Sequence, residues 1–444
     1  MSDGAGQDLN VIRADPSKAF FIDMLTRDIS IVECILDLID NAVDQAVEQT
    51  RINVMELLER GELQQRVEHA EIRIDFSREH FSISDSCGGI SVEEARQKVF
   101  LFGNPGERGA EHGLSVYGIG MKRAFFKLGN VIHVHSQTET EYFDVTIDVP
   151  EWKSHPHEWQ FEFDKFGPTQ DGGVTGTQIH IPMLREGIGD RLSSGSFSRD
   201  LRNRISSTYA LFLSAGVRVV VNGVPVEPRM PTVAGEPFRP VRRTFNVEEV
   251  EVLILASLSP RHDRTAHGWY VFCNGRMVLE ADKSSLTGWG DGLPNFHSKF
   301  NHFVGFVYFG STDVRKLPWR TTKQGVEKES PVYQAALDEM RIQARPIIDY
   351  LNTMYPTDLE AEGVEERELL DNAAIVTLPS LWKGETTFEV RRPARQVRTH
   401  VNIQYKRPRD LVEKIARYLG DPSLAASRIG EHTFDYFVAN EIDV

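Results

Sequence analysis

The sequence predicts an α+β protein with two consecutive α/β domains and a small helical C-terminal part. The chain has 444 residues, of which 40% are hydrophobic, so it is long enough for two or three globular domains. Short segments with alternating apolar and polar residues predict strands, and longer segments with helical spacing lie between them. We expect a disordered N-terminus at 1–14, domains at 15–190 and 191–355, a linker at 356–400 and a C-terminal module at 401–444.

The first informative segment is an acidic helix. Ser30 and Glu33 have the spacing of a capping box, which predicts that a helix begins here. Asp37, Asn41 and Asp44 follow four and three residues apart, so they stack on one face of that helix. A carboxamide oxygen suits Mg²⁺, and a carboxylate one turn away can take a proton from a water molecule. Alone, this pattern is more typical of an acidic surface helix.

The second segment follows a predicted β-hairpin. Residues 70–76 and 81–84 both alternate in polarity, with a short polar turn between them. Asp85 then emerges at the end of a strand, where its carboxylate can accept a hydrogen bond from the exocyclic amine of adenine. Gly89, followed by Ile90, lets the backbone pass close to a base. An ordinary acidic turn is the simpler interpretation of this segment when it is taken alone.

The third segment combines a loop with the start of a helix. Residues 100–116 contain four glycines and a proline and show little periodicity, which is typical of a mobile lid. Gly118 and Gly120 lead into a helix that contains Met121 and Lys122. Free N–H groups and the positive end of the dipole at such a helix start suit a triphosphate. Lys122 either adds charge there or is a solvated surface lysine.

In this order and spacing, the three segments resemble the GHKL ATPases (gyrase, the large heat-shock chaperone, histidine kinases and MutL). The sequence motif Tyr117-Gly118-x-Gly120-x-Lys122 is most similar to that of the MORC and MutL-like members. The resemblance implies a Bergerat-type ATP-binding α/β sandwich that binds ATP and Mg²⁺ without a Walker loop, and no Walker sequence competes for the nucleotide.

The resemblance also implies roles for individual residues. Asp37 is expected to be the general base and Asn41 the Mg²⁺ ligand. Other residues are expected to contact the nucleotide: Asn41, Asp44, Asp85, Gly89, Ile90, Gly118, Gly120, Met121, Lys122 and Thr177. Two positions depart from the family pattern, because Asp37 replaces a glutamate and Cys87 replaces a glycine. With the shorter Asp37, either the water lies closer to the backbone, or hydrolysis is slow, or a neighbour such as Glu33 or Asp40 assists. We expect the small Cys87 to be tolerated against the adenine plane.

The second domain resembles the transducer domain of the same proteins, which is ribosomal S5-like. A helix is predicted at 197–212, a hairpin turn at Asn222-Gly223 and a long helix at 331–354. The run Phe272-Cys-Asn-Gly-Arg276 resembles the Val-Asn-Gly-Arg hairpin of MutL-type transducers. In related ATPases a lysine from this domain reaches the γ-phosphate, and Lys323 is our candidate here. Arg320 and Gln324 are lesser candidates.

The C-terminal region differs in composition. Residues 358–371 are acidic, 391–409 are rich in arginine and lysine, and 401–405 suggest a strand; helices are predicted at 408–419 and 429–440. The basic stretch suits contact with nucleic acid or a protein partner, or is a solvated face. The formal net charge of −15 argues against a broad positive surface, so any contact with nucleic acid has to be local.

The remaining composition favours a cytoplasmic protein. No apolar segment approaches membrane-spanning length, and three scattered cysteines form no metal-ligand pattern. The resemblance implies a slow, Mg²⁺-dependent ATPase that forms a homodimer on ATP binding. Through lid closure and dimerisation the protein would act on DNA or on a DNA-bound partner, in genome maintenance or phage defence. The alternative is a chaperone-like, nucleotide-gated protein-interaction switch with little or no turnover.

Overall fold

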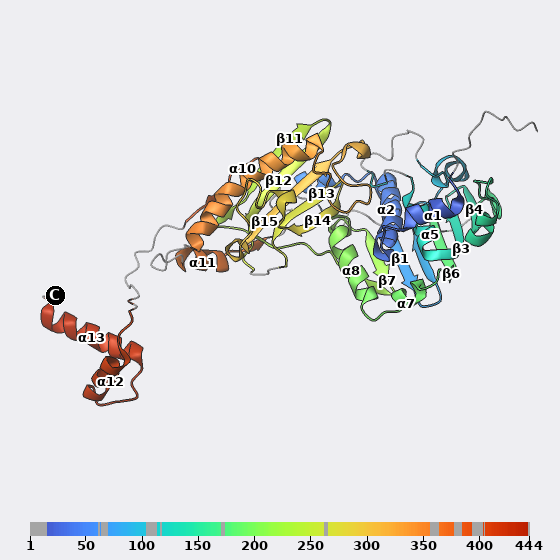
Figure 1. Cartoon of the computed structure of the whole chain (residues 1–444). Helices are drawn as coiled ribbons and strands as arrows, with labels where there is room; N and C mark the ends of the chain where they lie inside the picture. Colours follow the sequence, from blue (N-terminus) through green and yellow to red (C-terminus); the bar gives the residue numbers. More distant parts are fainter. Residues whose placement is uncertain are drawn as a thin grey trace, which may run out of the picture. The chain divides into compact units, whose positions relative to one another are not determined.

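The computed structural model divides into two compact units, one ending at Arg391 and the other beginning at Arg392. Each unit is described by itself (Figure 1). The structure describes residues 16–60, 63, 70–103, 113–115, 118–169, 174–261, 265–355, 364–376, 384–392, 403 and 405–442.

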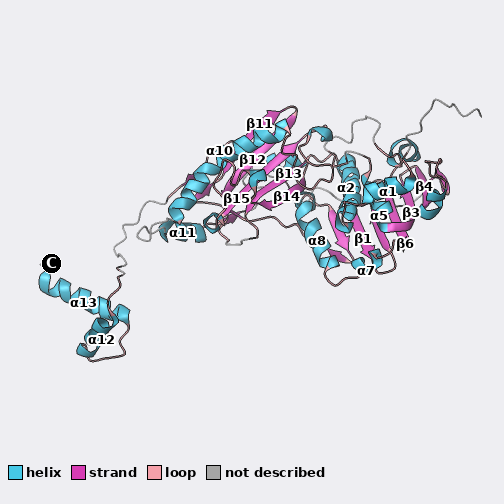
Figure 2. Ribbon diagram, in the orientation of Figure 1, coloured by secondary structure: helices cyan, strands magenta, loops and turns pink. Residues whose placement is uncertain are grey.

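A mixed, mostly antiparallel sheet of eight strands lies in the first part of the chain (Figure 2). Its order is β5-β4-β3-β6-β2-β1-β7-β8, and β1 and β7 are its parallel pair. Its strands are β1 (Glu71–Phe76), β2 (Phe81–Asp85), β3 (Gly129–Gln137), β4 (Glu141–Asp148), β5 (Lys165–Pro168), β6 (Gly176–Leu184), β7 (Arg218–Val221) and β8 (Val224–Pro225).

Two turns of this sheet follow the sequence expectation. The alternating segments form the antiparallel hairpin β1–β2, with Phe76 opposite Phe81. Asn222 and Gly223 connect β7 and β8 with φ angles of 46° and 74°, the left-handed values that a tight hairpin turn requires. The first sheet includes residues beyond the domain boundary expected near residue 190, because β7, at Arg218–Val221, pairs with β1.

The helices around the first sheet include the expected acidic helix, α2. Its capping box is confirmed: the Ser30 N–H donates to Glu33 Oε2 at 2.9 Å, and the Glu33 N–H donates to Ser30 Oγ at 3.2 Å. The helices of this region are α1 (Lys18–Thr26), α2 (Ile31–Thr50), α3 (Val54–Arg60), α4 (Val92–Glu94), the π-helical turn η1 (Ala95–Val99), α5 (Gly120–Leu128), α6 (Val149–Ser154), α7 (Ile188–Leu192), α8 (Phe197–Thr208) and α9 (Ala210–Ser214). The helix expected at 197–212 is therefore interrupted at Tyr209, between α8 and α9.

A second sheet of five strands has the order β11-β12-β15-β13-β14, with β13 and β15 parallel. Its strands are β11 (Val241–Val247), β12 (Val250–Leu258), β13 (Gly268–Cys273), β14 (Arg276–Asp282) and β15 (Phe303–Gly310). Every residue of β13 and β15 is buried, as expected for strands covered on both faces. The helix expected at 331–354 is confirmed as α10 (Pro331–Met354), which packs against β12 and β15 (Figure 1).

Short elements complete the first unit. β16 (Ile375–Val376) pairs with β9 (Val233–Ala234), and β17 (Glu389–Val390) pairs with β10 (Phe238–Arg239). The others are η2 (Ser285–Thr287), η3 (Ser298–Phe300), η4 (Val314–Lys316) and α11 (Val364–Asp371). Buried apolar residues of both large sheets form one connected core.

The second unit contains α12 (Arg409–Tyr418) and α13 (Ala426–Glu441). The two helices expected at 408–419 and 429–440 are thus present. Most of the strand expected at 401–405 lies outside the described residues.

Gly89 lets its own backbone approach the backbone of β3 closely, which a substitution can test. Its φ is +75°, and a Cβ atom there would lie 2.1 Å from the carbonyl oxygen of Gln137. We expect Gly89→Ala to lower the free energy of unfolding by about 2–5 kcal/mol, from backbone strain plus overpacking. Urea unfolding measures this.

Gly187→Ala is the matched control. Gly187 has a φ of +78° but nothing within 4 Å of a Cβ atom, so only backbone strain of about 1–2 kcal/mol is expected. Equal losses in the two variants would contradict the close approach at Gly89.

Candidate functional site

A cavity of about 450 Å³ lies among α2, the start of α5, β2 and β6. It gathers all but one of the site residues expected from the sequence: Asp37, Asn41, Asp44, Asp85, Ile90, Gly118, Gly120, Met121, Lys122, Thr177 and Lys323. Gly89 is outside the lining and packs against the backbone of β3 instead. Tyr117 and most of the expected lid lie outside the described residues.

Asp37 is fixed by Arg123 of α5. Nη2 and Nε of Arg123 donate to Asp37 Oδ2 at 2.7 and 3.2 Å, and both side chains are largely buried. Burial raises the pKa of Asp37, although the charges of Lys323 and Arg123 oppose the rise. Gly120 packs against the same carboxyl group, since a Cβ atom there would lie 3.2 Å from Asp37 Cγ. Arg123 was not among the residues expected at the site, although its position three residues after Gly120 places it in the first turn of α5.

Asn41 and Asp44 hold the segment that precedes α5. The Ser115 hydroxyl donates to Asn41 Oδ1 at 2.8 Å. The N–H groups of Leu114 and Ser115 donate to the two Asp44 oxygens at 2.5 and 2.9 Å. Burial raises the pKa of Asp44 to about 6, with these hydrogen bonds opposing the rise. Asp44 therefore lines the cavity while it also anchors the end of the expected lid, a role that the sequence did not reveal.

Asp85 lies at the other side of the cavity, beside an apolar wall. Its Oδ1 accepts a hydrogen bond from the Cys87 N–H at 2.9 Å, and burial raises its pKa to about 6. Gly176 lets β6 approach, because a Cβ atom there would lie 1.9 Å from the Asp85 carbonyl oxygen. The wall consists of Ile83, Ile90, Met121 and Ile179.

Cys87 is fully buried and is not part of the cavity lining. Burial raises the pKa of its thiol to about 12.

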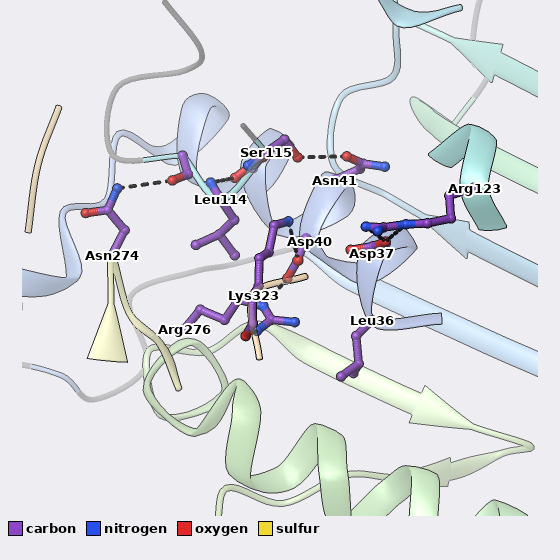
Figure 3. A network of polar contacts seen from close by, with 12 residues as sticks. Leu36, Asp37, Asp40, Asn41, Leu114, Ser115, Arg123, Asn274, Arg276 and Lys323 are labelled. Carbon is purple, nitrogen blue, oxygen red and sulfur yellow. Dashed lines mark hydrogen bonds and ion pairs between the residues drawn. The ribbon is translucent and has the colours of Figure 1, made fainter. Parts of the chain in front are cut away.

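Asp40 points away from the cavity and is the centre of a buried charge network (Figure 3). Lys323 Nζ lies 2.6 Å from its Oδ2, and Arg276 Nε lies 2.8 Å from its Oδ1. The Tyr209 hydroxyl donates to Asp40 Oδ1 at 2.5 Å and lies 2.8 Å from the Leu36 carbonyl oxygen. Burial favours a higher pKa for Asp40, but the charges of Arg276 and Lys323 outweigh it and leave that pKa below its ordinary value.

Neither neighbour considered as an assistant to Asp37 takes that position. Glu33 caps α2, and Asp40 is bound by Arg276 and Lys323. Neither of them lines the cavity. The ion pair of Asp37 and Arg123 therefore lines the cavity without either of these neighbours.

Two segments of the second sheet region contact the site. Lys323 lines the cavity, as expected, but its ammonium group binds Asp40. Asn274, in the turn between β13 and β14, donates from Nδ2 to the Gly113 carbonyl oxygen at 3.1 Å. In the same turn region, Arg276 Nη1 donates to the Lys323 carbonyl oxygen at 3.0 Å. The hairpin expected from Phe272 to Arg276 therefore contacts the end of the lid and the Lys323 loop.

Lys122 is buried rather than solvated. Its ammonium group donates to the Val99 carbonyl oxygen, at the end of η1, at 2.6 Å. Burial lowers its pKa to about 7.

One family model matches part of the chain. Residues 29–165 match the family described as histidine kinase-, DNA gyrase B-, and HSP90-like ATPase. The match covers α2, the Asp85 segment and α5, and it supports ATP binding by this part of the chain. A comparison with curated proteins found no match.

The donor set fits Mg²⁺ bound together with a nucleotide. Asn41 offers a carboxamide oxygen, and Mg²⁺ typically takes one or two protein oxygens besides waters and phosphates. Within the described ranges, no cluster of three histidine, cysteine or acidic side chains could hold a metal by itself. Among the same residues, no helix combines the length and apolar character needed to cross a membrane.

Asp40→Ala tests the charge network. The change leaves Arg276 and Lys323 buried without their carboxylate, so we expect the free energy of unfolding to fall by about 3–5 kcal/mol in urea titrations. Asp190→Ala is the control, because Asp190 pairs with Arg78 at the surface, where a loss below about 1 kcal/mol is expected. Similar losses in both variants would show that the buried network does not stabilise the fold.

Lys122→Met tests the buried lysine through pH. Between about pH 7 and 10.5 the unfolded chain keeps the proton that folded Lys122 releases, so this lysine makes stability rise with pH there. The difference in stability between wild type and Lys122→Met should change by about 1.4 kcal/mol per pH unit in that window and stay flat below it. A flat difference for Lys122→Met would contradict the lowered pKa.

Proposed function

We propose that this protein is a Mg²⁺-dependent ATPase that binds ATP in the 450 Å³ cavity and hydrolyses it slowly to ADP and phosphate. The observation that carries the proposal is that three separate motifs and Lys323 line one cavity. The family match over residues 29–165 agrees with this assignment.

The two sides of the cavity suit the two ends of ATP. Asp85 and the apolar wall suit adenine, because the carboxylate accepts from the exocyclic amine while the wall packs against the ring. The segment from Gly118 to Lys122, which leads into the first turn of α5, suits the phosphates with N–H groups and the positive end of the helix dipole. Asn41 would hold Mg²⁺, which neutralises phosphate charge when bound.

Asp37 is the proposed general base. Both Arg123 bonds converge on Oδ2, so Oδ1 is the oxygen proposed to accept a proton from the attacking water. The positive charge of Arg123 partly offsets the rise in the pKa of Asp37 that burial causes, and so limits the gain in base strength. The short side chain favours slow turnover.

Lys323 is the proposed link to the second sheet. Its ammonium group binds Asp40 at the border of the cavity, and a γ-phosphate would compete for it. Because Arg276 also binds Asp40, that carboxylate would keep one cation if Lys323 moved. We propose that this exchange accompanies lid closure and homodimerisation, and that the dimer acts on DNA or a DNA-bound partner.

The Asp37–Arg123 ion pair also favours a second candidate. A carboxylate held by a buried guanidinium suits a nucleotide-gated switch for protein partners that binds ATP with little turnover. ATP turnover with and without duplex DNA distinguishes the two, since only the first requires turnover that responds to DNA.

Calorimetry and phosphate release test the pocket together. We expect Asn41→Ala to abolish Mg²⁺-dependent ATP binding, because the metal loses its protein ligand. We expect Asp37→Ala to bind ATP but to lose turnover, since binding does not require the base. Asn203→Ala, at an exposed position of α8, should match wild type in both measurements.

Two outcomes would contradict this account. Wild type that shows no ATP binding with Mg²⁺ present would remove the proposed function. Equal turnover in wild type and Asp37→Ala would remove Asp37 as the base.

A further inference from the structure

A second cavity, of about 620 Å³, lies beside the Lys323 loop. The loop contributes to both cavities: Thr321 and Lys323 line the first, while Arg320, Gln324 and Gly325 line the second. Most of the remaining lining comes from β14, and α8 contributes Arg204. The volume is within the usual range for small-ligand sites.

The lining of this second cavity carries an excess of positive charge. Arg204, Arg229 and Arg320 face it, and Glu280 is the acidic residue among the described lining. Three positive charges and one negative charge leave a net charge of +2. An anion with two negative charges would therefore balance the cavity.

Glu280 is already engaged by groups of the protein. Arg229 Nη2 lies 2.6 Å from Glu280 Oε1, and the Ser207 hydroxyl donates to Oε2 at 3.1 Å. Arg204 lies on the same helix as Ser207. The pKa of Arg204 is lowered mainly by burial and, to a smaller extent, by the positive charge of Arg276. An anion would relieve this electrostatic penalty at Arg204.

Gln324 supplies an uncharged donor. It lines the cavity, and its Nε2 atom is buried without a hydrogen-bond partner among the residues that the structure describes. A buried donor without a partner costs free energy, which a ligand oxygen would recover. Guanidinium groups and an amide N–H together match the oxygens of a phosphate group.

We propose that this cavity is a second ligand site, which binds a small phosphorylated compound through Arg204, Arg320 and Gln324. The site is separate from the ATP cavity, and its existence does not depend on ATP binding there.

The loop geometry connects the two cavities. The Lys323 N–H donates to the Arg320 carbonyl oxygen at 2.7 Å, and the Arg320 N–H donates to the Gly325 carbonyl oxygen at 3.2 Å. Lys323 has a φ of 55°, in the left-handed region that only a few non-glycine residues occupy. An anion that draws Arg320 toward it therefore shifts the turn that places Lys323, and the two ligands affect each other's affinity reciprocally. This coupling rests on the proposed function of the first cavity.

Calorimetry with inorganic pyrophosphate tests the site. Pyrophosphate is titrated into the full chain in the presence of Mg²⁺ and a saturating non-hydrolysable ATP analogue. We expect wild type to bind it, and Arg204→Gln and Arg320→Gln each to weaken binding by about tenfold or more, because each removes a charged hydrogen bond. Arg199→Gln, at an exposed position of α8 outside the cavity, is the matched control and should bind as wild type does.

Asn41→Ala separates this inference from the ATP proposal. Pyrophosphate binding to wild type that persists with the saturating analogue, and that survives in Asn41→Ala, supports a separate site. Binding to wild type that appears only without the analogue would place pyrophosphate in the first cavity and overturn the inference. No binding to wild type, or equal binding by Arg204→Gln, Arg320→Gln and wild type, would also overturn it. Melting temperatures check that the variants are folded.

The coupling has its own readout. Pyrophosphate should change the affinity of wild type for the ATP analogue by about fivefold, the lower end of typical coupling, and should not change it in Arg320→Gln. An unchanged affinity in wild type would overturn the coupling. Failure of the analogue to bind at all would instead remove the proposed function of the first cavity.

Discussion

The carboxylate of Asp40 and its partners constrain the arrangement of the first unit. A carboxylate in the middle of a buried helix is unfavourable unless charges and hydrogen bonds compensate for lost water. Arg276, Lys323 and Tyr209 supply that compensation. All three come from later parts of the chain, so α2 is satisfied only when the second sheet region is in place. The packing of α2 therefore depends on the second sheet region as well as on the first sheet.

The spacing of polar residues along α2 separates two tasks. Asp37, Asn41 and Asp44 line the cavity, whereas Asp40 is turned toward the second sheet. Because Lys323 reaches both Asp40 and the cavity, the two faces share one cation. A change of charge in the cavity therefore acts on the Asp40 network directly through Lys323.

Local sequence patterns predicted local structure well. The capping box of α2, the β1–β2 hairpin and the Asn222-Gly223 turn depend on neighbours a few residues apart. Partners far apart in sequence left no comparable signal. Arg276 and Lys323 reach Asp40 across 236 and 283 residues, and nothing in the sequence of β7 shows that it pairs with β1. The three motifs nevertheless predicted residues that line one cavity, because the order and spacing of such motifs carry information on long-range packing that hydrophobic periodicity lacks.

The short acid at position 37 fits the close approach of α5. Gly120 has no side chain, and a Cβ atom there would lie only 3.2 Å from Asp37 Cγ, so the first turn of α5 lies directly against the carboxyl group. One turn later, Arg123 reaches Oδ2 from the same helix. Gly120 and Arg123 of α5 therefore both pack against the Asp37 carboxyl group of α2, and together they fix its position at the cavity.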